Sequence, residues 1–120
     1  MKGIVTLCGS SKFKKEFEIM NALLTFEGWI VLSAGVFEHS ETNKYILAEI
    51  KKRKKMLDQL HNEKIEMSQF IVVINKNLYV GESTQKEIDY AKEIGKSIYY
   101  WSDRHSWFNA ELVSAYDKKV

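Results

Sequence analysis

The sequence predicts a single α/β domain in which a doubly wound, parallel sheet lies between two layers of helices. Short apolar stretches alternate along the chain with longer amphipathic ones. Residues 70–74, Phe-Ile-Val-Val-Ile, are apolar on both faces, as a central parallel strand covered by helices requires. The chain of 120 residues has the length of one domain. We therefore expect one domain over residues 1–120, with strand order 2-1-3-4 and a C-terminal helix.

The first strand and the first helix are predicted close to the N-terminus. Residues 3–7 form a β-branched apolar run, and the small residues Cys8-Gly9-Ser10-Ser11 follow as a strand-to-helix turn. Apolar side chains recur at helical spacing between residues 12 and 27, and Gly28 is placed to end that helix. Residues 29–32 predict the second strand.

A long loop and a long helix are predicted for the middle of the chain. Residues 33–45 show neither a helical nor a strand period, and loops of this length are often functional. Residues 46–68 are rich in helix formers and apolar along one face, with an interruption expected near residues 51–55. The strand at 70–74 follows this helix.

The last third of the chain predicts a further strand and two helices. A loop over residues 75–83 leads into a helix at 84–94, which stops at Gly95. Residues 97–101 predict the fourth strand, and residues 109–119 predict a terminal helix.

Composition excludes several classes of function. Eighteen basic against 16 acidic residues give a net charge of +2, too small for bulk attraction to nucleic acid or membranes. No apolar run is long enough for a secretion signal or a bilayer span, so we expect a cytoplasmic protein. One cysteine excludes a disulfide within the chain, and three scattered histidines, His39, His61 and His105, make a zinc site unexpected. We expect neither a metal nor a cofactor.

The predicted topology places a ligand crevice between strands one and three. Ligands bind beyond the carboxyl ends of parallel strands, where the strand order reverses. Gly9, Ser10, Ser11 and Lys12 follow strand one and offer backbone N–H groups, hydroxyls and an ammonium that suit a phosphate. The alternative is an ordinary turn in which a serine caps the helix.

A carboxylate is the second candidate. Glu87 shares a helical stripe with apolar residues, which directs it inward, toward the crevice. Ser83 and Thr84 precede it in the same segment and are expected to bind the substrate. The alternative is a capping box, in which Thr84 caps the helix and Glu87 returns to the backbone N–H of the cap. Both roles are compatible, since a helix N-terminus also stabilises a reactive carboxylate.

Three further groups have a functional and a structural interpretation. His61 and Lys64 lie one helical turn apart and can face the crevice together if their helix crosses its mouth; His39 in the long loop is a weaker candidate, and a solvated helix face is the alternative. The basic run at residues 51–55 suggests a nucleic-acid patch, although a solvated face is the usual role of such a run. The aromatic residues at 99–101 and 107–108 can stack a base or pack in the core or between subunits.

Three segments together resemble the nucleoside 2-deoxyribosyltransferase-like family, which includes the 2′-deoxynucleoside 5′-monophosphate N-glycosidases. They are residues 4–11, residues 64–75 and residues 81–91, and the resemblance covers residues 2–101. It implies that Glu87 is a nucleophile that attacks C1′ of the sugar, that Gly9 and Ser10, with Ser11 and Lys12, bind the nucleotide, and that the chain forms oligomers such as a dimer.

The chain departs from the family pattern at several supporting positions. Thr6 replaces a tyrosine of the first strand, Gln69 replaces an acidic residue, and Gly81 and His61 stand where the family has acidic residues.

The function expected from the residues and the resemblance together is cleavage of the N-glycosidic bond of a nucleoside 5′-monophosphate. Glu87 forms an ester with the sugar, and His61 or Lys64 supplies a proton to the departing base. Water then makes the protein a hydrolase, whereas a second base makes it a deoxyribosyltransferase. The alternative is a binding protein that captures a nucleotide or nucleotide signal without cleaving it, with Glu87 only capping its helix. The expected partners are thus a small nucleotide or nucleoside and a second copy of the chain, rather than nucleic acid or a membrane.

Overall fold

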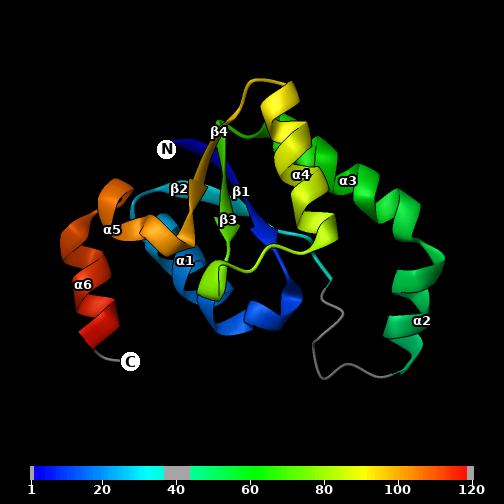
Figure 1. Ribbon diagram of the computed structural model, residues 1–120, viewed down its shortest axis with the longest axis horizontal. Helices are drawn as coiled ribbons and strands as arrows, with labels where there is room; N and C mark the ends of the chain where they lie inside the picture. The colour runs from blue at the N-terminus through cyan, green and yellow to red at the C-terminus, as the bar shows by residue number, and fades with distance from the viewer. Residues whose placement is uncertain (1, 37–43, 119–120) are drawn as a thin grey trace.

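The structure is a computed structural model that describes residues 2–36 and 44–118. Within these residues a sheet of four parallel strands has the order β2-β1-β3-β4, which confirms the predicted fold class (Figure 1). The strands are β1 (Gly3–Gly9), β2 (Trp29–Leu32), β3 (Phe70–Ile74) and β4 (Ser97–Tyr100). The two central strands are thus the ones whose apolar runs are buried on both sides.

Helices connect the strands and cover both faces of this Rossmann-like sheet. The α-helices are α1 (Lys14–Phe26), α2 (Lys44–Lys52), α3 (Lys54–Met67), α4 (Glu82–Glu93), α5 (Arg104–Trp107) and α6 (Ala110–Lys118). Short 3₁₀ helices are η1 (Ser11–Phe13), η2 (Lys76–Leu78) and η3 (Trp101–Asp103). No helix in the described parts of the chain is both long and apolar enough to cross a bilayer.

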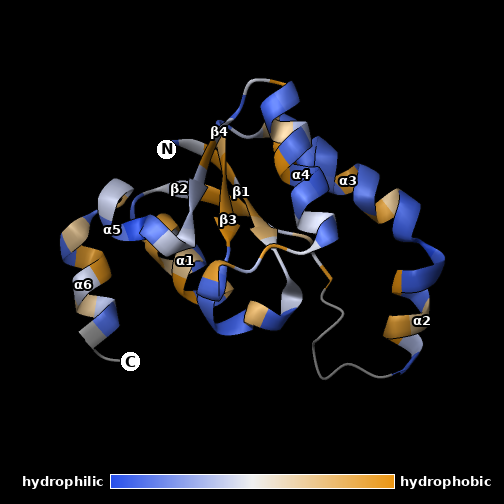
Figure 2. Ribbon diagram, in the orientation of Figure 1, coloured by the Kyte–Doolittle hydropathy of each residue, from blue (hydrophilic) through white to orange (hydrophobic). Residues whose placement is uncertain are grey.

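Alternate side chains of the central strands build two separate cores, one on each face of the sheet. Val5 and Leu7 of β1, with Val72 and Ile74 of β3, pack under α1. Their neighbours in the sequence point the other way and pack against α3 and α4; these are Cys8, Ile71 and Val73, joined by Ile65, Ile88 and Ala91. Figure 2 shows the apolar strands between helices whose outer faces are hydrophilic. Cys8 therefore belongs to the face that α3 and α4 cover.

The helix boundaries differ from the expectations in ways that matter for the site. The predicted interruption of the long helix is confirmed, and it falls at Arg53 between α2 and α3. The predicted loop at 33–45 ends earlier, because α2 begins at Lys44; residues 37–43 lie outside the described chain. Helix α4 begins at Glu82, two residues before Thr84. Strand β4 ends at Tyr100, and η3 and α5 were not predicted.

The aromatic residues of β4 and α5 pack against one another and against the sheet. Tyr99 lies between Phe70 and Trp107, with ring centroids 5.1 Å away on both sides, and Trp29 and Phe108 extend the array at its two ends. Most of these contacts are edge to face, the arrangement that aromatic pairs prefer. The rings contact one another, which favours a role in packing over a role in stacking a base of a ligand.

Candidate functional site

A cavity of about 300 Å³ opens beyond the carboxyl ends of β1 and β3, at the reversal of strand order where the topology predicts a crevice. Its walls come from the end of β1 and the following turn, from α2 and α3, and from the start of α4. The lining residues are Leu7, Gly9, Ser10, Ser11, Phe17, Ala34, Val36, Ile50, Lys54, Leu57, Asp58, His61, Tyr79, Gly81, Glu82, Ser83, Thr84 and Glu87. A smaller hollow of about 280 Å³ continues between α3 and α4 and shares Glu87 with the cavity.

The end of β1 lies close against the end of β3 because Gly9 has no side chain. Its φ of +150° is rare for other residues, and a Cβ atom there would meet the carbonyl oxygen of Ile74 at 2.7 Å. Ser10 then caps η1, since its Oγ accepts a hydrogen bond from the backbone N–H of Lys12 at 3.3 Å. Gly9, Ser10 and Ser11 all line the cavity. The predicted serine cap is therefore confirmed, and three of the four residues of this turn border the cavity, whereas phosphate binding by them stays a prediction.

The loop between β3 and α4 is hydrogen-bonded to η3, which follows β4. Asn75 accepts a hydrogen bond from the backbone N–H of Ser102 at 2.9 Å and donates one to its hydroxyl at 3.0 Å. Two successive residues, Asn77 and Leu78, then adopt left-handed backbone angles, and Gly81 begins the helix without a side-chain cap. These features direct the first turns of α4 toward the cavity.

Glu87 lies in the second turn of α4, so the capping-box interpretation is wrong. Thr84 is the third residue inside the helix and is buried, whereas the cap itself is Gly81. The inward direction of Glu87, predicted from the apolar stripe of its helix, is confirmed. The Glu87 side chain is 22% exposed and lines the cavity.

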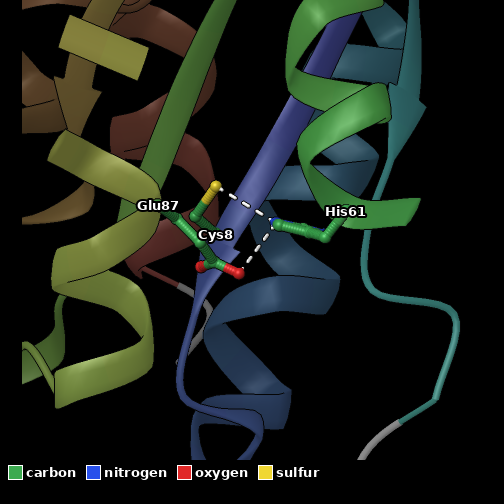
Figure 3. Close-up of side chains that lie close together, drawn as sticks. All are labelled: Cys8, His61 and Glu87. Atoms are coloured by element: carbon green, nitrogen blue, oxygen red, sulfur yellow. Dashed lines mark hydrogen bonds and ion pairs between the residues drawn. The ribbon is translucent and has the colours of Figure 1, made fainter. Parts of the chain in front are cut away.

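Three side chains from three elements meet beside the cavity, which His61 and Glu87 line and behind which Cys8 is buried (Figure 3). Nε2 of His61, on α3, lies 3.3 Å from Oε2 of Glu87, on α4, and 3.4 Å from Sγ of Cys8, on β1. Helix α3 packs against both β1 and α4, which is how His61 reaches the crevice. Nδ1 of His61 is buried and has no hydrogen-bond partner among the described residues.

Burial shifts the pKa values of all three groups toward their uncharged forms. It raises the pKa of Glu87 to about 7, with the charge of Asp58 adding to the rise and that of Lys54 opposing it. It lowers the pKa of His61 to about 4, together with the charge of Lys64, against the charge of Asp58. The pKa of Cys8 is raised by burial and by Glu87. Near neutral pH, His61 is thus uncharged, and Glu87 is present in both its protonated and its ionised form.

Comparison of the whole chain with protein-family models, with curated proteins and with solved structures finds no match. The site is therefore interpreted from its own residues.

Lys64 and Lys12, which were predicted to place cations at the site, do not line the cavity. Nζ of Lys64 donates a hydrogen bond to the carbonyl oxygen of Ser33 at 2.7 Å, and Lys64 does not line the cavity. Nζ of Lys12 lies 3.5 Å from the centroid of the Tyr79 ring, and Lys12 is likewise absent from the lining. Long side chains have many rotamers, so their direction depends on tertiary partners that a sequence pattern does not show.

Lys54 provides a cation at the cavity that was not predicted as a site residue. It forms an exposed ion pair with Asp58, with Nζ 3.2 Å from Oδ2, and both residues line the cavity. A helical stripe carries the signal that identifies them, because Lys54, Asp58 and His61 are spaced by four and three residues. An exposed pair of this kind contributes about 0–1 kcal/mol, so a ligand can readily separate it.

His105, and the basic run apart from Lys54, lie away from the cavity lining. Nε2 of His105 lies 2.8 Å from Oδ2 of Asp117, far along the chain from the cavity residues, and His39 lies outside the described residues. Arg53 pairs with Glu49 one turn away, and the whole run at residues 51–55 is exposed. This arrangement favours the solvated-face interpretation of the run.

Proposed function

We propose that this protein cleaves the N-glycosidic bond of a nucleoside 5′-monophosphate, with the Glu87 carboxylate as nucleophile at C1′. One observation carries the proposal: a largely buried carboxylate lines the crevice at the strand-order reversal, with a histidine nitrogen 3.3 Å from one of its oxygens. The resemblance of residues 4–11, 64–75 and 81–91 to the nucleoside 2-deoxyribosyltransferase-like family supplies the reaction class.

The proposed reaction has two steps at one carbon. In the first, a Glu87 oxygen bonds to C1′ while the bond from C1′ to the base breaks, and the base takes the bonding electrons and a proton. In the second, water attacks C1′, releases sugar 5-phosphate and regenerates the carboxylate. If a second base replaces the water, the same ester gives a base-exchange reaction.

His61 is the residue that we assign to orient Glu87. Because it is uncharged near neutral pH, its Nε2–H can donate a hydrogen bond to the ionised carboxylate without withdrawing a full charge from it. Lys64, the other proposed proton donor, lies outside the cavity lining. Because His61 is uncharged near neutral pH, the departing base takes its proton from water rather than from His61.

A 5′-phosphate fits the polar side of the cavity better than an uncharged sugar does. The hydroxyl-bearing residues Ser10, Ser11 and Ser83 line the cavity together with the cation of Lys54. Hydroxyls, backbone N–H groups and one ammonium are the usual partners of a phosphate. Lys54 thereby takes the role that Lys12 was expected to fill.

The test is incubation of the full chain with a panel of deoxyribonucleotides, ribonucleotides and the corresponding nucleosides, with chromatography for free base. We expect base release by the native chain and a loss on the order of 10³-fold or more in Glu87→Gln, with binding retained. Glu93→Gln is the matched control, because Glu93 lies on the same helix, is exposed and does not line the cavity.

Binding without base release from any member of the panel would instead support a non-catalytic nucleotide-binding protein. That alternative assigned Glu87 to a helix cap, a role that the start of α4 at Glu82 excludes. Base release that survives in Glu87→Gln contradicts the proposed mechanism.

A further inference from the structure

The cluster of Cys8, His61 and Glu87 brings together one sulfur, one nitrogen and one oxygen donor. The three donor atoms all lie within 4.8 Å of one another, and they come from β1, α3 and α4 (Figure 3). Cys8 and His61 are buried, and Glu87 borders the cavity. Thiolate, imidazole and carboxylate are the three ligand types that zinc takes in proteins.

Two of the three distances within the cluster match those between ligands of one tetrahedral ion. Zinc binds sulfur at about 2.3 Å, nitrogen at about 2.0–2.1 Å and oxygen at about 2.0–2.2 Å, so its ligand atoms stand about 3.4–3.6 Å apart. Here His61 Nε2 is 3.4 Å from Cys8 Sγ and 3.3 Å from Glu87 Oε2. The remaining pair, Cys8 Sγ and a carboxylate oxygen of Glu87, lies within 4.8 Å.

The charges of the cluster also suit a divalent cation. Without a cation, burial first and the charge of Glu87 second raise the pKa of the Cys8 thiol, so two anions are disfavoured at this site. One divalent ion neutralises both anions. Burial meanwhile keeps His61 uncharged, which is the form in which histidine binds metals.

We propose that Cys8, His61 and Glu87 form a binding site for a zinc ion, with the fourth coordination position directed into the cavity. Three protein ligands and one open position are the pattern of zinc sites that exchange a ligand. The ligand types favour zinc and cobalt over magnesium and calcium, which prefer sites made of oxygen atoms.

The site lacks one feature of tightly held zinc. A histidine ligand usually donates its second N–H to an acceptor, and loss of that partner typically weakens metal binding 10–100-fold. Nδ1 of His61 has no such partner among the described residues. The ion therefore binds reversibly, and because Glu87 is one of its ligands, bound zinc withholds the carboxylate from any other reaction. Only this inhibitory consequence rests on the proposed function; the binding site itself does not.

Cobalt(II) titration of the reduced, chelator-treated full chain tests the site directly. Cys8 is the one cysteine of the chain, so a thiolate-to-cobalt charge-transfer band must come from Cys8. We expect this band together with the intense visible bands of tetrahedral cobalt, and their loss when one equivalent of zinc is added. Magnesium should leave the bands unchanged.

Two variants and one control test Cys8 and His61 as ligands. Cys8→Ser should remove the charge-transfer band, and His61→Gln should weaken cobalt binding by at least an order of magnitude. His105→Gln is the control, because it removes a histidine that contacts a carboxylate elsewhere, and it should bind cobalt as the native chain does. Circular dichroism establishes that each variant is folded.

The native spectrum decides the proposal even if a variant fails to fold. Absence of the charge-transfer band at millimolar cobalt overturns the site, and so does a band that a folded His61→Gln retains at native affinity. Neither result affects base release, which is measured without added metal, so failure of the zinc site and failure of the proposed reaction are distinguishable.

Discussion

Nε2 of His61 lies 3.3 Å from Oε2 of Glu87, and this contact joins α3 to α4 across the inner end of the cavity. Burial favours the uncharged form of both side chains, because it raises the pKa of Glu87 to about 7 and lowers that of His61 to about 4. Glu87 therefore titrates near neutral pH and His61 only in acid, so the effects of the two groups can be measured separately.

The first prediction concerns the pH dependence of base release. If ionised Glu87 is the nucleophile, kcat/KM should rise with pH through about 7, because burial holds the pKa of its carboxyl there. Initial rates at subsaturating nucleotide, in buffers containing a chelator, give the profile. A profile that falls through the same pH indicates that Glu87 donates a proton instead of attacking the sugar.

The second prediction concerns stability. The pKa of Glu87 is raised from 4.5, so its contribution is complete below about pH 4.5 and is lost as pH rises through about 7. The pKa of His61 is lowered from 6.5, so its contribution is complete above about pH 6.5 and is lost as pH falls through about 4. Between about pH 4.5 and 6.5 the two slopes oppose each other, and the free energy of unfolding should change little because of this pair.

Single substitutions should expose each slope. Glu87→Gln leaves the His61 contribution, so its free energy of unfolding should increase with pH by up to about 1.4 kcal/mol per unit between about pH 4.5 and 6.5. His61→Gln should show the opposite slope, because burial still raises the pKa of Glu87. Urea unfolding at several pH values in chelator-containing buffer measures both. Parallel curves for the two variants would contradict the assigned shifts.

The third prediction identifies the phosphate contact. Lys54→Met should raise KM for a nucleoside 5′-monophosphate by roughly 3–10-fold and leave KM for the nucleoside unchanged, since an exposed cation contributes on the order of 1 kcal/mol. Lys55→Met is the control, because Lys55 is equally exposed but does not line the cavity. A selective loss in Lys12→Met with none in Lys54→Met would place the phosphate beside Tyr79 instead.

The sequence was most informative where a short apolar run has turn residues at its ends. Strands β2 and β3 match the predicted ranges residue for residue, since Gly28 precedes one and polar residues flank the other. Two buried faces on β3 also predicted its central place in the sheet. The inward direction of Glu87 followed from the apolar stripe of its helix, a local property that tertiary packing preserves.

Contacts between distant segments were not predictable in the same way. Cys8 and His61 are far apart in the sequence, and the pattern that places them side by side exists only once α3 packs on β1. The capping-box pattern of Thr84 and Glu87 was misleading because Gly81 begins the helix earlier without a side-chain cap. The site is thus assembled by packing, whereas each of its helices is a local feature of the sequence.

The fourth prediction compares two glycines. At Gly9 a side chain would collide with a neighbouring strand, whereas at Gly28 it would only strain the backbone. Gly9→Ala should destabilise the fold strongly, by about 2 kcal/mol or more, because the new Cβ would lie 2.7 Å from the carbonyl oxygen of Ile74 and force β1 and β3 apart. Gly28→Ala should lower the free energy of unfolding by only about 1 kcal/mol, since its φ is +91° but nothing lies within 4 Å of its Cβ position. Urea unfolding of the two variants gives the difference. If both variants lost the same free energy of unfolding, the turn after β1 would be able to shift and accommodate a side chain. The cavity wall that this turn forms would then not be rigid.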